Sequence, residues 1–287
     1  MPSTEPLVLP GGPAAPDFAE GSIFFVGTAT VIIRYAGFTI LTDPNFLHAG
    51  DHVHLGYGLR STRRWDPAMD FEDLPPIDFV VLSHLHEDHF DRLVEERLDR
   101  ATPILSTPQA AAALRDKGFT AARALLRWET QVVRKGEAEV RVTAMPGKHG
   151  PGPLTAALPA VMGSMLEFGP AGGAPTFRLY ITGDTLIHDA LREIPQRYPE
   201  IDLALLHLGG TRVLGIMLTM DARQGVEAIR IVRPKLAIPI HYNDYTVFRS
   251  PPGDFVAAVK AAGLTGQVRY LAHGDTYRFR VARGRTG

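Results

Sequence analysis

The chain has 287 residues, of which 45% are hydrophobic and 21% charged, the balance of a globular protein with a sizeable core. Its formal net charge is −1, which argues against a protein that binds nucleic acid through bulk charge. Because the chain contains no cysteine, disulfides, iron–sulfur clusters, cysteine nucleophiles and thiolate zinc sites are excluded. Any transition-metal site must therefore use histidine and carboxylate ligands.

The N-terminal segment does not resemble a secretion signal. Residues 1–20 carry five prolines and no positively charged stretch, so we expect a loose arm there, followed by a single domain over residues 21–287. No segment approaches the ~20 apolar residues of a membrane-spanning helix. We therefore expect a cytoplasmic protein without membrane insertion.

The first half of the domain predicts a meander followed by βα units. Apolar and β-branched runs at residues 22–26, 30–35 and 38–42 are separated by turn residues. Residues 44–76 form a long irregular segment, and loops of that length inside a domain are often functional. A buried strand follows at 77–82, then a helix at 91–98 and a strand at 104–106. Thr107 as N-cap, Pro108 at the first turn and Gly118 after the last turn predict the next helix.

The second half predicts further strands at residues 140–144, 165–168, 177–181, 203–206 and 236–240, with 165–168 and 177–181 paired as a hairpin. Asp221 with Gln224 three residues later resembles a capping box that starts a helix running to Val232. Another helix is expected at 254–262. Strands outnumber helices, so we expect an α+β fold in which helices cover sheets.

One short segment concentrates potential metal ligands. His84, His86, Asp88 and His89 lie within six residues, directly after a buried strand. Imidazole and carboxylate together suit zinc, iron or manganese. In an extended stretch His84 and His86 point to one side, and Asp88 and His89 can point to a neighbouring position once the chain turns. The segment could thus serve two metals; the alternative is a capped helix start with incidental histidines.

Three later residues occupy similar positions. His149, Asp184 and His241 each come just after an apolar strand, where ligands gather at the edge of a sheet. Alone, each could be a structural hydrogen-bonding residue. Together with the segment 84–89, they are predicted metal ligands.

The chain resembles the metallo-β-lactamase superfamily, in particular the branch that contains N-acyl-phosphatidylethanolamine phospholipase D and the ascorbate-6-phosphate lactonase relatives. The resemblance covers residues 22–280 and implies a four-layer αββα sandwich. Many members of this branch have histidine where this chain has Thr28, which cannot act as a ligand or base in its place. Besides the segment 84–89, the resemblance rests on residues 25–30 (FVGTAT), 41–44 (LTDP), 74–78 (LPPID), 183–185 (GDT) and 238–242 (IPIHY).

The resemblance also implies roles for individual residues. Two divalent transition-metal ions are expected, zinc first, with manganese or iron as alternatives. Asp43 would orient a ligand imidazole, the alternative being a simple turn before Pro44. Asp88 could assist proton transfer, although ligation is its favoured role. The first metal would be held by His84, His86 and His149, the second by Asp88, His89 and His241, with Asp184 bridging them.

The predicted activity is metal-dependent hydrolysis of a small ester, lactone or phosphoester by a hydroxide that bridges two metals. Alternatives are a phosphodiesterase or phospholipase-D-like hydrolase, and a non-catalytic metal-binding scaffold. The partner would be a small molecule, which could be anionic, and no nucleic acid is expected. Candidate substrate contacts, for which packing, capping or a solvated loop is the alternative, are His207, His188, Tyr242, Asn243, Arg60, Arg63 and Arg64.

Overall fold

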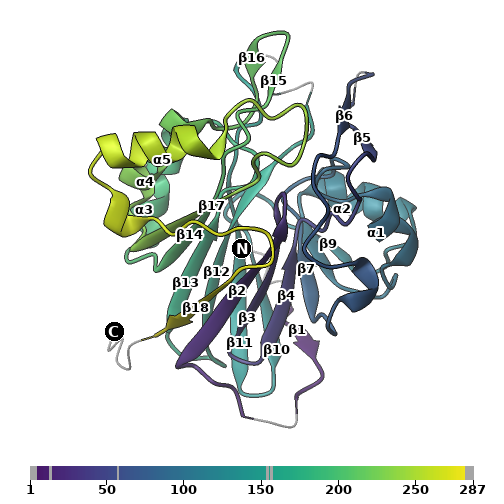
Figure 1. Cartoon of the computed structure of the whole chain (residues 1–287). Coiled ribbons are helices and arrows are strands. Elements are labelled where there is room, and N and C mark those ends of the chain that lie inside the picture. The colour runs from purple at the N-terminus through teal and green to yellow at the C-terminus, as the bar shows by residue number, and fades with distance from the viewer. Residues whose placement is uncertain (1–4, 13–14, 57, 153–154, 156–157, 282–287) are drawn as a thin grey trace.

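Two seven-stranded sheets dominate the computed structural model of the protein, which describes residues 5–12, 15–56, 58–152, 155 and 158–281 (Figure 1). In spatial order, the strands of the first sheet are β18 (Thr276–Arg280), β2 (Glu20–Gly27), β3 (Thr30–Tyr35), β4 (Phe38–Thr42), β7 (Phe79–Val81), β8 (Ile104–Ser106) and β9 (Ala122–Ala124). Those of the second sheet are β1 (Leu7–Leu9), β10 (Thr130–Lys135), β11 (Ala138–Pro146), β12 (Met162–Pro170), β13 (Phe177–Ile181), β14 (Leu203–His207) and β17 (Leu236–Ile240).

The sheets pack face to face because many of their strands are apolar on both sides. In β3, Ile33 lies in the cluster between the sheets, while Ile32 packs outward against helices. In β12, Leu166 faces inward and Met165 outward in the same way. Since successive side chains of a strand point to opposite faces, near-continuous apolar runs can build one inner core and two outer cores.

Helices cover both outer faces. α1 (Arg92–Arg97) and α2 (Pro108–Asp116) pack on the first sheet, whereas α3 (Ile194–Arg197), α4 (Ala222–Val232) and α5 (Pro252–Ala261) pack on the second. The layers therefore follow the order αββα, which confirms the predicted fold class. Three short 3-10 helices complete the helical elements of the described residues: η1 (Phe71–Asp73), η3 (Asp189–Glu193) and η4 (Thr265–Gln267).

The predicted starts of α2 and α4 are confirmed, with one correction, whereas α5 starts at Pro252 and not at the predicted residue 254. The Thr107 hydroxyl accepts the Ala110 N–H at 3.2 Å, and Pro108 occupies the first turn of α2. Asp221 caps α4 by accepting the Arg223 and Gln224 N–H groups. The capping box is wrong, however, because the Gln224 side chain accepts the Ile187 N–H instead of returning to the cap. This bond attaches α4 to the segment that follows Asp184.

The strand directions explain why the predicted ligands converge. In the first sheet, β4 and β7 run parallel. In the second sheet β13, β14 and β17 run parallel, and β11 points the same way because β12 is antiparallel to both β11 and β13. The carboxyl ends of these strands therefore lie at one edge of each sheet, and the polar residues that follow them meet there.

The predicted loose arm is wrong for part of its length. Leu7–Leu9 forms β1, whose residue Leu7 pairs with Val133 of β10, so this segment extends the second sheet. The division into an arm and a single domain otherwise stays a prediction. Two small ribbons were also not predicted: β5 (His52–His54) with β6 (Arg60–Thr62), and β15 (Arg212–Val213) with β16 (Ile216–Met217). No helix among the described residues has the length and apolar character needed to cross a bilayer.

Candidate metal centre

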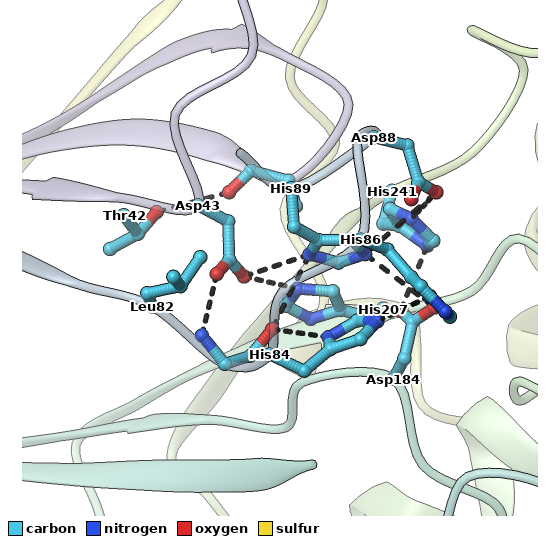
Figure 2. A network of polar contacts seen from close by, with 12 residues as sticks. Thr42, Asp43, Leu82, His84, His86, Asp88, His89, Asp184, His207 and His241 are labelled. Atoms are coloured by element: carbon cyan, nitrogen blue, oxygen red, sulfur yellow. Dashed lines mark hydrogen bonds and ion pairs between the residues drawn. The ribbon is translucent and has the colours of Figure 1, made fainter. Parts of the chain in front are cut away.

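Three histidines, of which Figure 2 labels His84 and His86, form a first group at the shared edge of the sheets. One ring nitrogen each of His84, His86 and His149 lies within 4.8 Å of the others, and His84 Nε2 is 2.9 Å from His86 Nδ1. His149 Nδ1 lies 3.2 Å from the Leu218 carbonyl oxygen. Because a carbonyl only accepts, Nδ1 carries the proton and Nε2 keeps a lone pair for a metal.

A second group consists of Asp88, His89 and His241, again with one ligand atom each within 4.8 Å of the others. Asp88 Oδ2 is 3.4 Å from His241 Nε2 and 3.9 Å from His89 Nε2. His241 directly follows β17, and its φ of +56° turns the chain sharply at that point. The first and second groups are therefore built from strands of both sheets.

Asp184 lies between the two groups. Its Oδ2 is 3.5 Å from His89 Nε2, and its Oδ1 is 3.2 Å from His241 Nδ1. A carboxylate oxygen of Asp184 also lies within 4.8 Å of ring nitrogens of both His84 and His89, one from each group. The structure thus brings all seven predicted ligands together, with Asp184 in reach of both sets.

Asp43 contacts the second group through the ring of His89 (Figure 2). Its Oδ1 accepts the Ser83 N–H at 2.7 Å, and its Oδ2 lies 3.2 Å from His89 Nδ1 and 3.4 Å from His207 Nε2. A carboxylate partner at Nδ1 leaves His89 Nε2 directed at the other ligands. This geometry agrees with the expectation that Asp43 orients an imidazole.

Ser83 was not among the site residues predicted from the sequence. Its hydroxyl lies 3.0 Å from His84 Nδ1 and 3.3 Å from His89 Nδ1, so it touches one ring of each group. The only available signal was its place directly before the histidine segment. Ser83 restricts the orientation of both rings without being a ligand itself.

The histidines of the first group are held neutral. Burial lowers the pKa of His84 well below its ordinary value, lowers that of His86 to about 4, and lowers that of His149. A neutral imidazole has a lone pair to donate, whereas an imidazolium has none. The three rings are therefore in the state that metal binding requires.

The carboxylates are held ionised. Burial would raise the pKa of Asp88 and Asp184, but neighbouring histidines outweigh it and lower both values. Burial would likewise raise the pKa of Asp43, yet His89 and His207 bring it down to about 2. Conversely, burial alone would lower the pKa of His89. The carboxylates of Asp184, Asp88 and Asp43 outweigh burial and raise this pKa well above its ordinary range, with Asp184 contributing most.

This donor set fits divalent cations. Asp88 Oδ1, His89 Nε2, Asp184 Oδ1 and His241 Nδ1 are buried and make no hydrogen bond within the described part of the chain. Buried ionised carboxylates are costly unless they are paired or bind a cation. Zinc, manganese and iron all accept imidazole and carboxylate ligands that converge on one point, as these do.

His207 does not occupy the place expected of a substrate contact. It is fully buried, with Nε2 toward Asp43 and Nδ1 3.2 Å from the Thr182 hydroxyl. Its ring stacks on that of His89, with centroids 5.9 Å apart. Because both nitrogens of His207 are occupied inside the protein, we correct its role to one of positioning Asp43 and His89.

The arginines of the long segment are not gathered into an anion site. Arg63 is 1% exposed, and its guanidinium donates to the carbonyls of Trp65 at 2.8 Å and Asn45 at 3.2 Å. It also lies over the Tyr245 ring. Arg63 is therefore a structural residue, whereas Arg60 and Arg64 are exposed.

The residues after His241 have mixed surroundings. The Tyr242 hydroxyl donates to the Leu271 carbonyl at 3.1 Å, which points to packing. Asn243 is half-buried, with a φ of +66°. Thr28 is buried, and its carbonyl accepts the His241 N–H at 2.5 Å. The backbone of Thr28 therefore holds His241 in place, whatever side chain stands at this position.

Sequence comparison identifies relatives. Residues 39–242 match the family model of the beta-lactamase superfamily domain. A UPF0173 metal-dependent hydrolase of Archaeoglobus fulgidus is 30% identical over 212 residues, which cover 70% of this chain and 82% of that protein. A protein of the same description from Pyrobaculum islandicum is 26% identical over 256 residues, covering 89% of this chain and 99% of its own length.

Solved structures show the same fold. An isothiocyanate hydrolase from Delia radicum gut bacteria superimposes with a TM-score of 0.76 at 20% identity, covering 91% of this chain and 100% of that one. A metallo hydrolase from the archaeon Ignicoccus hospitalis gives a TM-score of 0.65 at 23% identity, covering 91% and 98%. At these identities the likeness establishes architecture only.

Proposed function

Because this chain belongs to the β-lactamase superfamily, among its UPF0173 metal-dependent hydrolases, we propose that it cleaves a small ester, lactone or phosphoester with two divalent metal ions. The observation that carries this proposal is the convergence of two histidine-containing groups on Asp184. A single structural ion would not need six potential ligands, five of them buried, arranged around a buried carboxylate.

In this proposal His84, His86 and His149 hold one ion, and Asp88, His89 and His241 hold the other, with Asp184 reaching both. Zinc is the first candidate, and manganese and iron are the alternatives that the same donors accept. The lowered pKa values of the first-group histidines support it, since these rings stay available at neutral pH.

When bound, two divalent cations lower the pKa of water and polarise a substrate carbonyl or phosphoryl oxygen. The protein residues supply orientation and proton handling. Asp43 and Ser83 fix the rings of His84 and His89, so that little reorganisation is needed during the reaction. In this proposal Asp88 is first a ligand, and its Oδ1, which is buried and makes no hydrogen bond to a described residue, would also accept a proton.

A phosphodiesterase or phospholipase-D-like activity is the second candidate. It rests on the motifs at residues 25–30 and 41–44, which resemble that branch of the superfamily. This narrower resemblance stays a prediction, as does the cytoplasmic location. A non-catalytic metal-binding scaffold is the remaining outcome that experiments must exclude.

The test combines elemental analysis with hydrolysis assays before and after metal stripping. The substrate panel contains a lactone, an aryl ester, a phosphomonoester, a phosphodiester and an isothiocyanate. We expect about two transition-metal ions per chain, and turnover that chelation removes and added metal restores. Turnover that persists in rigorously metal-free protein would refute the proposal.

Variants separate the site from the rest of the molecule. Asp184→Asn should lower metal content and reduce turnover by about a hundredfold or more, because it removes the shared carboxylate. His52→Ala, which changes an exposed histidine of β5, is the matched control and should leave both unchanged. Two bound metals with no turnover on any substrate would indicate a scaffold.

A further inference from the structure

A cavity of about 510 Å³ is lined in part by residues that directly precede the candidate ligand His149 or contact Ser83. Its wall includes Gly147 and Lys148, which directly precede His149. It also includes Met162, whose N–H donates to the carbonyl of Ser83 at 3.0 Å. The cavity and the metal centre therefore share two segments of chain, and its volume is in the range of small-molecule sites.

The lining of this cavity is apolar, with a few basic groups. Its lining includes the apolar residues Leu126, which is 64% exposed, and Val161, which is partly exposed. The ionisable residues that line it are Arg127, Lys148 and His188, and no carboxylate residue is present among the described lining residues. An apolar cavity with convergent basic groups suits an apolar ligand that carries an anionic group.

The positive charge of this cavity is only partly compensated. Lys148 is absent from the lysine ion pairs of the described chain, which involve Lys117, Lys135 and Lys235. Arg127 forms an ion pair with Glu193, in which Nη2 lies 3.0 Å from Oε1. Both side chains are about half exposed. The Lys148 ammonium is therefore available to a ligand.

His188 adds a polar group to the lining of this cavity. Its Nε2 is buried and makes no hydrogen bond to a described residue. Burial, and after it the charges of Lys148 and Arg127, lower the pKa of His188, which places all three groups within electrostatic range of one another. A neutral ring can still donate a hydrogen bond through Nε2 to an anionic oxygen.

We infer that this cavity binds the apolar body and the anionic oxygen group of the substrate, with Lys148 as charge partner and His188 as hydrogen-bond donor. The inference rests on the proposed function and narrows its substrate class to esters, lactones or phosphoesters that carry a carboxylate or phosphate away from the scissile bond. It also moves the anion site from the exposed loop arginines to the segments around His149 and Asp184.

The test is a calorimetric titration of the metal-loaded 287-residue chain with 4-phenylbutyrate, its neutral amide and 3-phenylpropyl phosphate. Lys148→Met should weaken binding of the carboxylate about tenfold while leaving the amide within about twofold, because only the charge-assisted contact is lost. Lys260→Met, at an exposed lysine of α5, is the control and should change neither. His188→Ala should weaken both anionic probes. If the carboxylate probe binds more tightly and depends on Lys148, the cavity prefers a carboxylate. If the phosphate probe does so, it prefers a phosphate.

Two results would overturn the inference. One is equal affinity of the unaltered protein for the carboxylate and the amide. The other is carboxylate binding that Lys148→Met leaves intact and His241→Ala abolishes, because the anion would then bind at the metal centre. Since the titration needs no turnover, Lys148-dependent binding without hydrolysis would count against the proposed function and still support this site.

Discussion

Residues of the metal centre adopt backbone conformations that side chains seldom accept. Asp43 and His241, which each follow a strand, have φ values of +37° and +56°. Such conformations cost free energy for residues other than glycine and persist only where surrounding contacts determine them. At Asp43 these contacts are the bonds to Ser83, His89 and His207. The backbone strain therefore coincides with the points at which side chains turn toward the site.

The role of Asp43 can be tested with Asp43→Asn. The amide keeps the shape but removes the negative charge that faces His89 and His207, so metal affinity should fall by about 10- to 100-fold. A chelator competition assay measures this change, with circular dichroism to verify folding. Asp116→Asn, at an exposed carboxylate of α2, should have no effect. Unchanged affinity in Asp43→Asn would mean that the residue only shapes the turn before Pro44.

Arg63 offers a test of structural against substrate-binding roles. Arg63→Met removes buried, charged hydrogen bonds to the carbonyls of Asn45 and Trp65, and should lower the free energy of unfolding by about 2–3 kcal/mol. Arg64→Met, at the exposed neighbour, should stay within about 0.5 kcal/mol. Urea unfolding measures both. A raised KM with unchanged stability in Arg63→Met would restore the substrate-binding interpretation.

At the scale of elements, the site depends on how strands end. β13 stops at Ile181, and Gly183 then turns the chain with a φ of +61° so that Asp184 faces the histidines. A Cβ at Gly183 would lie 2.6 Å from the Met162 carbonyl oxygen, so β12 approaches this turn closely. Glycine is thus required here for both conformation and space.

Gly183→Ala should therefore destabilise the protein by about 2–4 kcal/mol, from backbone strain plus the steric conflict. Gly215→Ala is the matched control, because its φ of +81° is also positive but no atom lies within 4 Å of the added Cβ. The control should cost only about 1–2 kcal/mol. Chemical denaturation gives both values, and equal losses in the two variants would contradict the packing argument.

At the scale of the whole molecule, the predicted ligands connect the two sheets. The segment 84–89 follows β7 of the first sheet, whereas His149, Asp184 and His241 follow β11, β13 and β17 of the second. Bound metal would therefore link the layers across their shared edge. Because metal binds the folded chain more tightly than the unfolded one, its removal should lower the melting temperature.

Metal removal should also make stability depend on pH in a defined direction. In the metal-free protein the pKa of His86 is lowered from its ordinary value of 6.5 to about 4, and those of His84 and His149 move the same way. Between these values the unfolded chain binds more protons, so the stability present above pH 6.5 is lost as pH falls toward about 4. The pKa of His89 is raised instead, so its contribution to stability changes with pH only above this window. Thermal melts at several pH values check the sign, and stability that rises on acidification would contradict it.

The sequence alone determined much of the architecture. Strands at 30–35, 38–42, 104–106, 177–181 and 236–240 were predicted with the bounds that the structure shows, because apolar β-branched runs between turn residues need no distant information. The segment 84–89 was equally readable, since its donors are adjacent in the chain. His149, Asp184 and His241 were predicted from their positions just after apolar strands, whereas the grouping of the ligands into two sets came from the resemblance to a family.

Only the tertiary structure decided the rest. The edge strand β1 has only three residues, and the edge strand β18 is partly polar, so their pairing depends on the neighbours β10 and β2. His207, the buried Arg63 and the cavity with Lys148 and His188 owe their roles to residues from separate parts of the chain. Local periodicity carries information about single elements, whereas these contacts arise when two sheets pack and their strand ends meet.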